Sequence, residues 1–167
     1  MTSPDSTQAS PRGDQPAKGS LAKRRRNARQ KAMQALYQWD FDQQAAPVDD
    51  IVQQFCDLQN MDRVDVEFFA ALAAYVPANL AEIDACIVEF ADRELAELDP
   101  VERAILRVAC AELKSRLDIP YRVVVNEAVE VAKLFGAEEG HKYINGVVDK
   151  MAATIRTIEY RQPDAKG

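Results

Sequence analysis

The sequence predicts an all-α protein, a bundle of about seven helices joined by short connections. Hydrophobic residues make up 47% of the 167 residues, whereas only 6 are glycine, a balance typical of helix-rich folded proteins. Apolar side chains recur at three- and four-residue steps in successive segments. Outside residues 121–135 no segment has the composition or alternation of a strand. At this length we expect a single domain with a substantial core.

The N-terminal half is expected to hold four helices. The first begins near Lys23 with basic residues and becomes apolar toward Phe41. Pro47 closes the connection to the second helix. The apolar positions of the next three are Val48, Ile51, Val52, Phe55 and Leu58; Phe68, Phe69, Leu72, Ala73 and Val76; and Leu80, Ile83, Ile87 and Phe90. Asn79 with Glu82 three residues later has the pattern of a capping box and predicts the start of the fourth helix.

A fifth helix is predicted over 99–117. Asp99 and Pro100 give the clearest start signal in the chain, because aspartate caps a helix and proline suits its first position. The apolar stripe that follows is broad, which indicates a helix buried on more than one side.

Residues 121–135 favour two structures. Three consecutive valines, at 123–125, favour a strand, whereas apolar side chains keep helical spacing for three turns. Length and composition favour a sixth helix, and Gly136 fits its C-terminal cap. The last helix is expected over about 137–158. Residues 1–20 and 161–167 are expected to be a disordered extension and a flexible tail, flanking one helical domain over 21–160.

Positive charge is concentrated near the N-terminus. Residues 1–31 carry a net charge of +6, whereas the whole chain carries −6. A positive end on a negative body predicts an arm that holds a polyanion, nucleic acid above all. On a helix Arg25, Arg26 and Arg29 lie close to one face, and arginine-rich helices commonly order on RNA. The alternative is a solubilising tail or a targeting signal.

Two tyrosines strengthen the prediction of RNA binding. Tyr37 lies two and three turns beyond the arginines, and Tyr143 is next to Lys142. Aromatic rings beside cations hold single-stranded bases by stacking. Each tyrosine is equally compatible with an ordinary position at the edge of the core.

Nothing in the sequence favours an enzyme. His141 is the single histidine, and the common catalytic and phosphate-binding motifs are absent, so we expect no catalytic residues, metal or cofactor. Cys56, Cys86 and Cys110 are odd in number and widely spaced, which favours free thiols in a reducing cytoplasm. No apolar run is long enough for a membrane span and no secretory signal is recognisable. The expected location is cytoplasmic.

Four sequence blocks resemble the NusB family of bacterial transcription antitermination factors. They are RRRNARQKAMQALYQW at 24–39, VERAILR at 101–107, PY with VNEAVEVAK within 120–133, and KLFGAEEGHKYINGVVDK at 133–150. The resemblance covers about residues 21–157. It implies an all-helical fold of two packed subdomains and binding of boxA-type RNA jointly with a small-subunit ribosomal protein, called NusE in this role. It also implies association with transcribing RNA polymerase and support of ribosomal RNA synthesis through terminators.

The resemblance also assigns roles to individual residues. The implied RNA contacts are Lys23, Arg24, Arg25, Arg26, Arg29, Tyr37, Glu139, Lys142 and Tyr143. The implied NusE-binding surface uses the helices around 80–91, 99–117 and 121–135, with Glu102 as a contact. An acidic surface there suits a basic ribosomal protein. The sequence leaves open a protein–protein scaffold with a merely solubilising basic segment, and a homodimer when the protein is free.

Overall fold

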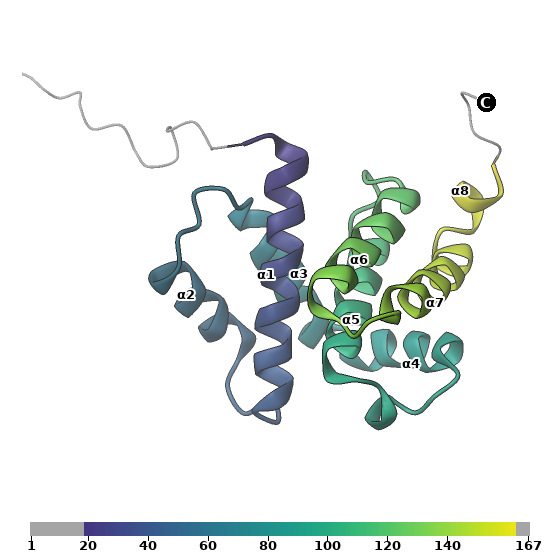
Figure 1. Cartoon of the computed structure of the whole chain (residues 1–167), viewed down its shortest axis with the longest axis horizontal. Coiled ribbons are helices and arrows are strands. Elements are labelled where there is room, and N and C mark those ends of the chain that lie inside the picture. Colours follow the sequence, from purple (N-terminus) through teal and green to yellow (C-terminus); the bar gives the residue numbers. More distant parts are fainter. Residues whose placement is uncertain (1–18, 163–167) are drawn as a thin grey trace, which may run out of the picture.

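Every regular element in the computed structural model is a helix within residues 19–162, the part of the chain that the structure describes (Figure 1). The elements are α1 (Leu21–Phe41), α2 (Val48–Leu58), α3 (Val66–Ala78), α4 (Leu80–Ala91), the 3-10 helix η3 (Leu95–Glu97), α5 (Pro100–Ser115), α6 (Tyr121–Phe135), α7 (Gly140–Ile155) and α8 (Thr157–Arg161). The all-α prediction is confirmed. The predicted N-terminal extension and C-terminal tail lie outside the described residues, apart from positions 19–20 and 161–162.

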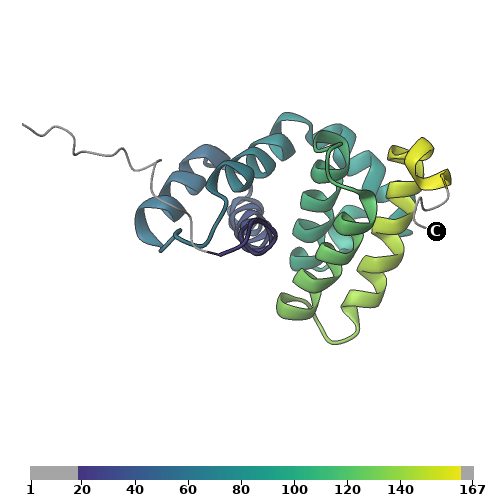
Figure 2. The ribbon, with the colours of Figure 1, turned by 90° about the horizontal axis from the view of Figure 1, so that it is seen from above.

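The helices pack as two units, as the resemblance implied. Helices α1 to α3 contact one another, and α4 to α7 form the second unit. In Figure 2 α1 is seen nearly end-on, with α2 on its left and the layer that holds α6 and α7 on its right. Contacts of α5 with both α1 and α3 join the two units.

Helix α5 is the centre of the core. Every residue from Ala104 to Leu113 is buried, so the expectation from its broad apolar stripe is confirmed. Two charged side chains, Arg107 and Glu112, are buried within that stretch. Both are paired: Arg107 donates to the two carboxylate oxygens of Asp84 at 2.9 and 3.0 Å. Buried charges require such partners.

The helix starts follow the sequence signals in one case and depart from them in another. Asp99 caps α5, because its carboxylate accepts from the backbone N–H groups of Val101 and Glu102 at 2.8 and 3.3 Å. The capping box predicted at Asn79 is wrong, since its side chain makes no capping bond to α4. Instead the amide donates to the carbonyl oxygen of Tyr75 at 3.0 Å. Helix α3 ends one residue before α4 begins, so its free carbonyl groups compete for that amide.

The ambiguous segment 121–135 is helical, and Gly136 ends it as expected. This glycine is needed for close approach, because a Cβ atom there would lie 2.8 Å from the carbonyl oxygen of Ala132. The final helix is shorter than predicted and breaks at Arg156. The buried Arg156 guanidinium donates to the carbonyl oxygens of Leu113, Arg116 and Ile119 at 2.8, 2.9 and 3.0 Å. These bonds satisfy the carbonyl groups at the end of α5 and just beyond it. They also fix the break in the C-terminal helix, which local sequence does not encode.

Within the described residues no single helix is long and apolar enough to cross a membrane. By length and composition α3 and α4 could do so only as a pair, and they are bent by 85° relative to each other. Several of their apolar side chains, Phe69 and Ile83 among them, are fully buried in the core.

Candidate nucleic-acid interface

The first turns of α1 present cations to solvent. The helix begins where the Ser20 hydroxyl accepts from the backbone N–H of Lys23 at 3.1 Å. The side chains of Lys23 and Arg26 are exposed, and those of Arg24 and Arg25 are partly exposed. Among the described residues Nε of Arg24 is buried without a hydrogen-bond partner. An anion at this end of α1 therefore finds several cations that are exposed or partly exposed.

Carboxylates from the body of the protein hold two of these arginines. Nε of Arg25 lies 3.4 Å from Oδ2 of Asp65, the residue that caps α3. Nε and Nη2 of Arg26 donate to the two oxygens of Glu127 on α6 at 3.0 and 2.8 Å. These hydrogen bonds raise the pKa of Arg26. The basic segment is thus partly neutralised within the molecule.

Arg29 departs from the expectation of an exposed cation. Its side chain is only 6% exposed, and it donates to both oxygens of Glu112 on α5 at 2.7 and 2.5 Å. Helical spacing predicts that Arg29 shares a face of α1 with Arg25 and Arg26. At the position of Arg29, however, this face of the helix packs against α5. In this structure Arg29 joins the two helical units and does not contribute to the exposed surface.

Phe68 organises the guanidinium groups behind this surface. The guanidinium carbons of Arg25, Arg29 and Arg116 lie 5.1, 5.0 and 5.0 Å from the centre of its ring. Such stacking favours a cation over an aromatic face. Arg25 and Arg29 also line a hollow of about 270 Å³ between α1 and the start of α6, together with Leu21, Ala22, Asp118, Ile119, Pro120, Val123 and Glu127.

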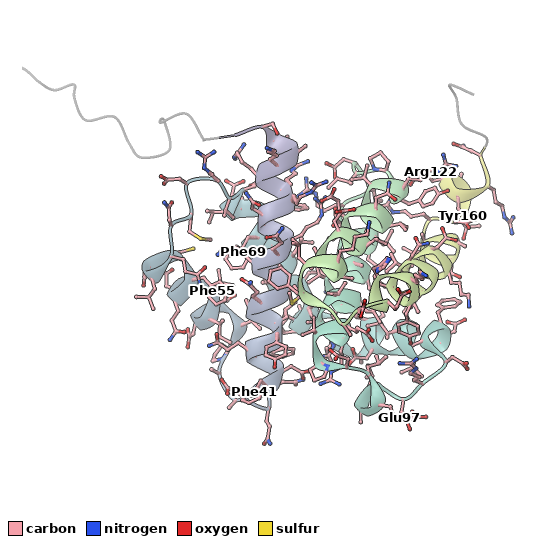
Figure 3. The ribbon with its side chains drawn as sticks, in the orientation of Figure 1. Phe41, Phe55, Phe69, Glu97, Arg122 and Tyr160 are labelled. Carbon is pink, nitrogen blue, oxygen red and sulfur yellow. The ribbon has the colours of Figure 1, made fainter. Side chains whose placement is uncertain are left out.

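The opposite end of α1 carries an aromatic ledge. The rings of Tyr37 and Phe41 are stacked, with centroids 6.1 Å apart and planes 22° from parallel. Phe41 is 73% exposed, and Figure 3 shows it at the far end of α1 from the arginines. A hollow of about 460 Å³ adjoins the two rings and is also lined by Gln34, Gln38 and Phe55. Apolar rings with amide groups at their edge can hold a planar ligand by stacking.

Tyr143 is less available than Tyr37. Its hydroxyl donates to the carbonyl oxygen of Ala91 at 2.7 Å, and the guanidinium of Arg93 lies 4.4 Å from its ring centre. Burial raises the pKa of Tyr143. Lys142 and Glu139 are exposed beside it and form an ion pair at 2.8 Å. A base can stack on this face of the ring only if the Arg93 guanidinium moves away from it.

Glu102, the expected partner contact, is buried at the start of α5. Its carboxylate lies against Gly140, where an added Cβ atom would be 2.8 Å from Oε2. Burial, together with the charge of Asp99, raises the pKa of Glu102. Its carboxylate is therefore a poor candidate for a direct surface contact in this conformation.

The site residues fall into two groups. Arg26 and Tyr37 are eleven positions apart, about 16 Å along a helix axis. The C-terminal end of α1 lies near the start of α5, because Nε of Arg103 donates to Asp40 at 2.8 Å. The start of α7 meets the same region, since Gly140 lies against Glu102. The structure thus groups the cations at one end of α1 and gathers Tyr37 and the start of α7 toward the other.

Sequence reasoning missed the acidic partners of the arginines and the exposed ring of Phe41. Glu112 had a detectable signal, a lone carboxylate inside a broad apolar stripe. Asp65 and Glu127 had none, because their partners are distant in sequence.

Other chemistry is sparse in the described part of the chain. No group of three or more residues of the types that bind metals gathers there. A hydrogen bond with the thiol of Cys110 lowers the pKa of Cys86, whereas burial raises the pKa of Cys56. The cysteines are free thiols.

Comparison with known protein families matches residues 26–153 to the NusB family. Transcription antitermination protein NusB of Pseudomonas fluorescens is 44% identical over 164 residues, which cover 96% of this chain and 98% of the relative. The protein of the same name from Yersinia pestis is 47% identical over 132 residues, covering 79% of this chain and 94% of the relative.

Solved structures give the same result. T. maritima NusB superposes with a TM-score of 0.72 at 27% identity, covering 82% of this chain and 96% of that one. A crystal structure of antitermination factors NusB and NusE in complex with dsRNA has a chain with a TM-score of 0.64 at 28% identity. That match covers 81% of this chain and 99% of that one.

Proposed function

Because the chain belongs to the NusB family, whose members are non-enzymatic transcription antitermination factors, we propose that it binds boxA-type single-stranded RNA. It does so jointly with a small-subunit ribosomal protein in the NusE role. In the cytoplasm this complex joins transcribing RNA polymerase and supports ribosomal RNA synthesis through terminators.

The cation group at the start of α1 carries the proposal. Lys23, Arg24, Arg25 and Arg26 are exposed or partly exposed on a chain whose net charge is −6. Guanidinium groups pair with phosphate oxygens through two parallel hydrogen bonds. Arg29 contributes by holding α1 in place rather than by touching RNA.

Stacking supplies the second half of the mechanism. Phosphate contacts position a nucleic acid, whereas contacts to bases specify its sequence. Tyr37 offers a ring at the hollow near the end of α1, and each such stack contributes about 1–3 kcal/mol. Lys142, Glu139 and Tyr143 add polar and aromatic groups at the start of α7.

An acidic strip supports a basic ribosomal partner. Exposed carboxylates along α4 and toward α5 are Glu82, Glu89, Asp92, Glu94, Glu97 and Asp99. Opposite charge steers association and selects partners. Glu102 is buried at the start of α5. It therefore positions this part of the surface and does not touch the partner directly.

The test is a titration of labelled single-stranded RNA, boxA-type against scrambled, with and without the ribosomal protein. We expect the partner to tighten binding of the boxA-type RNA selectively, and Arg24→Ala with Arg26→Ala to weaken it. The matched control, Lys133→Ala with Lys150→Ala, removes the same charge from exposed sites on α6 and α7 and should retain binding. Equal affinity for the two RNAs, or equal loss in both variants, would refute the proposal. A duplex arm of the titration separates single-strand from double-strand binding.

A further inference from the structure

Glu127 lies between two arginines of α1. Nε and Nη2 of Arg26 donate to its two oxygens at 3.0 and 2.8 Å. Nη1 of Arg29 lies 3.6 Å from Oε1 of the same carboxylate. The Glu127 side chain is 13% exposed and that of Arg26 is 46% exposed. The carboxylate therefore meets Arg26 from the protein side, while the guanidinium remains open to solvent.

A carboxylate and a phosphate compete for the same pair of N–H groups on arginine. Because Glu127 occupies the Nε–Nη2 edge of Arg26, a phosphate that binds at this edge must displace it. Exchange is feasible because solvent-exposed ion pairs are weak. Arg29 differs, since Glu112 holds it by two hydrogen bonds inside the core.

We propose that Glu127 competes with RNA phosphate for Arg26 and so lowers the affinity of the chain for RNA of any sequence. Phosphate contacts carry no sequence information. Weakening them leaves binding more dependent on base contacts and on the protein partner. Glu127 is thus a residue that sets selectivity, and the inference rests on the function proposed above.

The test is Glu127→Gln, which keeps the size of the side chain and removes its charge. We expect the variant to bind boxA-type and scrambled RNA about two- to fivefold more tightly, the range of one exposed ion pair. Because Arg26 contacts phosphate in both proteins, the slope of log affinity against log salt should stay close to the wild-type value. Far-UV circular dichroism and urea unfolding verify that the variant is folded.

Two controls isolate the direct contact. Glu130→Gln removes the same charge one turn along α6, from a carboxylate that pairs with Lys133 at 3.6 Å, and should leave RNA affinity near the wild-type value. In an Arg26→Ala background, Glu127→Gln should bring no gain, because the guanidinium for which Glu127 and phosphate compete is gone. Unchanged or weaker binding by Glu127→Gln, or an equal gain from Glu130→Gln, overturns the inference.

The outcomes separate this inference from the proposed function. Failure of the wild-type chain to bind RNA, with no effect of Arg24→Ala and Arg26→Ala, refutes the function itself. Binding that these substitutions weaken, but that Glu127→Gln does not strengthen, refutes only the role of Glu127.

Discussion

The buried ion pair between Arg29 and Glu112 is expected to be the most sensitive polar contact of the fold. Their side chains are 6% and 1% exposed, and the pair joins α1 to α5 across the two units. Arg29→Ala leaves the Glu112 carboxylate buried without its main partner. Removing one partner of a buried pair costs about 3–5 kcal/mol, a large share of a total stability of about 5–15 kcal/mol.

Urea unfolding followed by far-UV circular dichroism measures this loss. Arg26→Ala is the matched control, because it removes an arginine one turn away whose ion pair with Glu127 is exposed, with an expected loss of about 0.2–1 kcal/mol. Replacing both members, Arg29→Met with Glu112→Leu, removes both charges together and should leave the protein as stable as the wild type or more stable by about 1–4 kcal/mol. An Arg29→Ala loss no larger than that of Arg26→Ala would refute the reasoning.

Three further predictions concern titrating groups. Burial opposes ionisation of Asp40, but the Arg103 hydrogen bond and a second arginine outweigh it and lower the pKa of Asp40, so Asp40→Asn should lose about 1–2 kcal/mol at neutral pH. That difference should shrink in urea unfolding as pH falls through the folded-state pKa of the carboxyl, and a pH-independent difference would contradict it. The pKa of Glu102 is raised by burial and a neighbouring aspartate, so Glu102→Gln should be more stable than wild type at neutral pH and lose this advantage in acid; a destabilised variant at neutral pH contradicts this. Cys86 should react with iodoacetamide several-fold faster than Cys56 at mildly alkaline pH, because a neighbouring thiol lowers the pKa of Cys86 whereas burial raises that of Cys56; peptide mass spectrometry showing the reverse order would exclude it.

Local pattern accounts for most of the fold. Residues 121–135 form a helix despite three valines in succession, because apolar spacing over three turns outweighs strand propensity. Asp99 caps α5 as expected from a local signal. The break at Arg156 could not be predicted, since it depends on carbonyl groups at the end of α5. The capping box predicted at Asn79 is wrong for a related reason, because the end of α3 and the start of α4 compete for the same side-chain amide.

In the candidate site, too, local pattern predicts some features and tertiary contacts decide the others. The spacing of Arg25, Arg26 and Arg29 predicts that they lie near one face of α1. It does not predict how deeply each side chain is buried. Arg29 is buried because Glu112, 83 residues away, meets it in the core. Arg26 remains accessible because Glu127 holds it at the surface. Sequence alone therefore predicts which helix carries the charge, whereas tertiary pairing decides which of its cations can reach a ligand.

The most direct test of RNA binding by α1 is the salt dependence of affinity for single-stranded RNA, measured between about 50 and 200 mM salt. With four accessible cations, Lys23, Arg24, Arg25 and Arg26, log affinity should fall against log salt with a slope of about −2.8, at roughly 0.7 per phosphate contact on a single strand. A slope near zero, with binding retained, would contradict the assignment of α1 as the element that holds RNA.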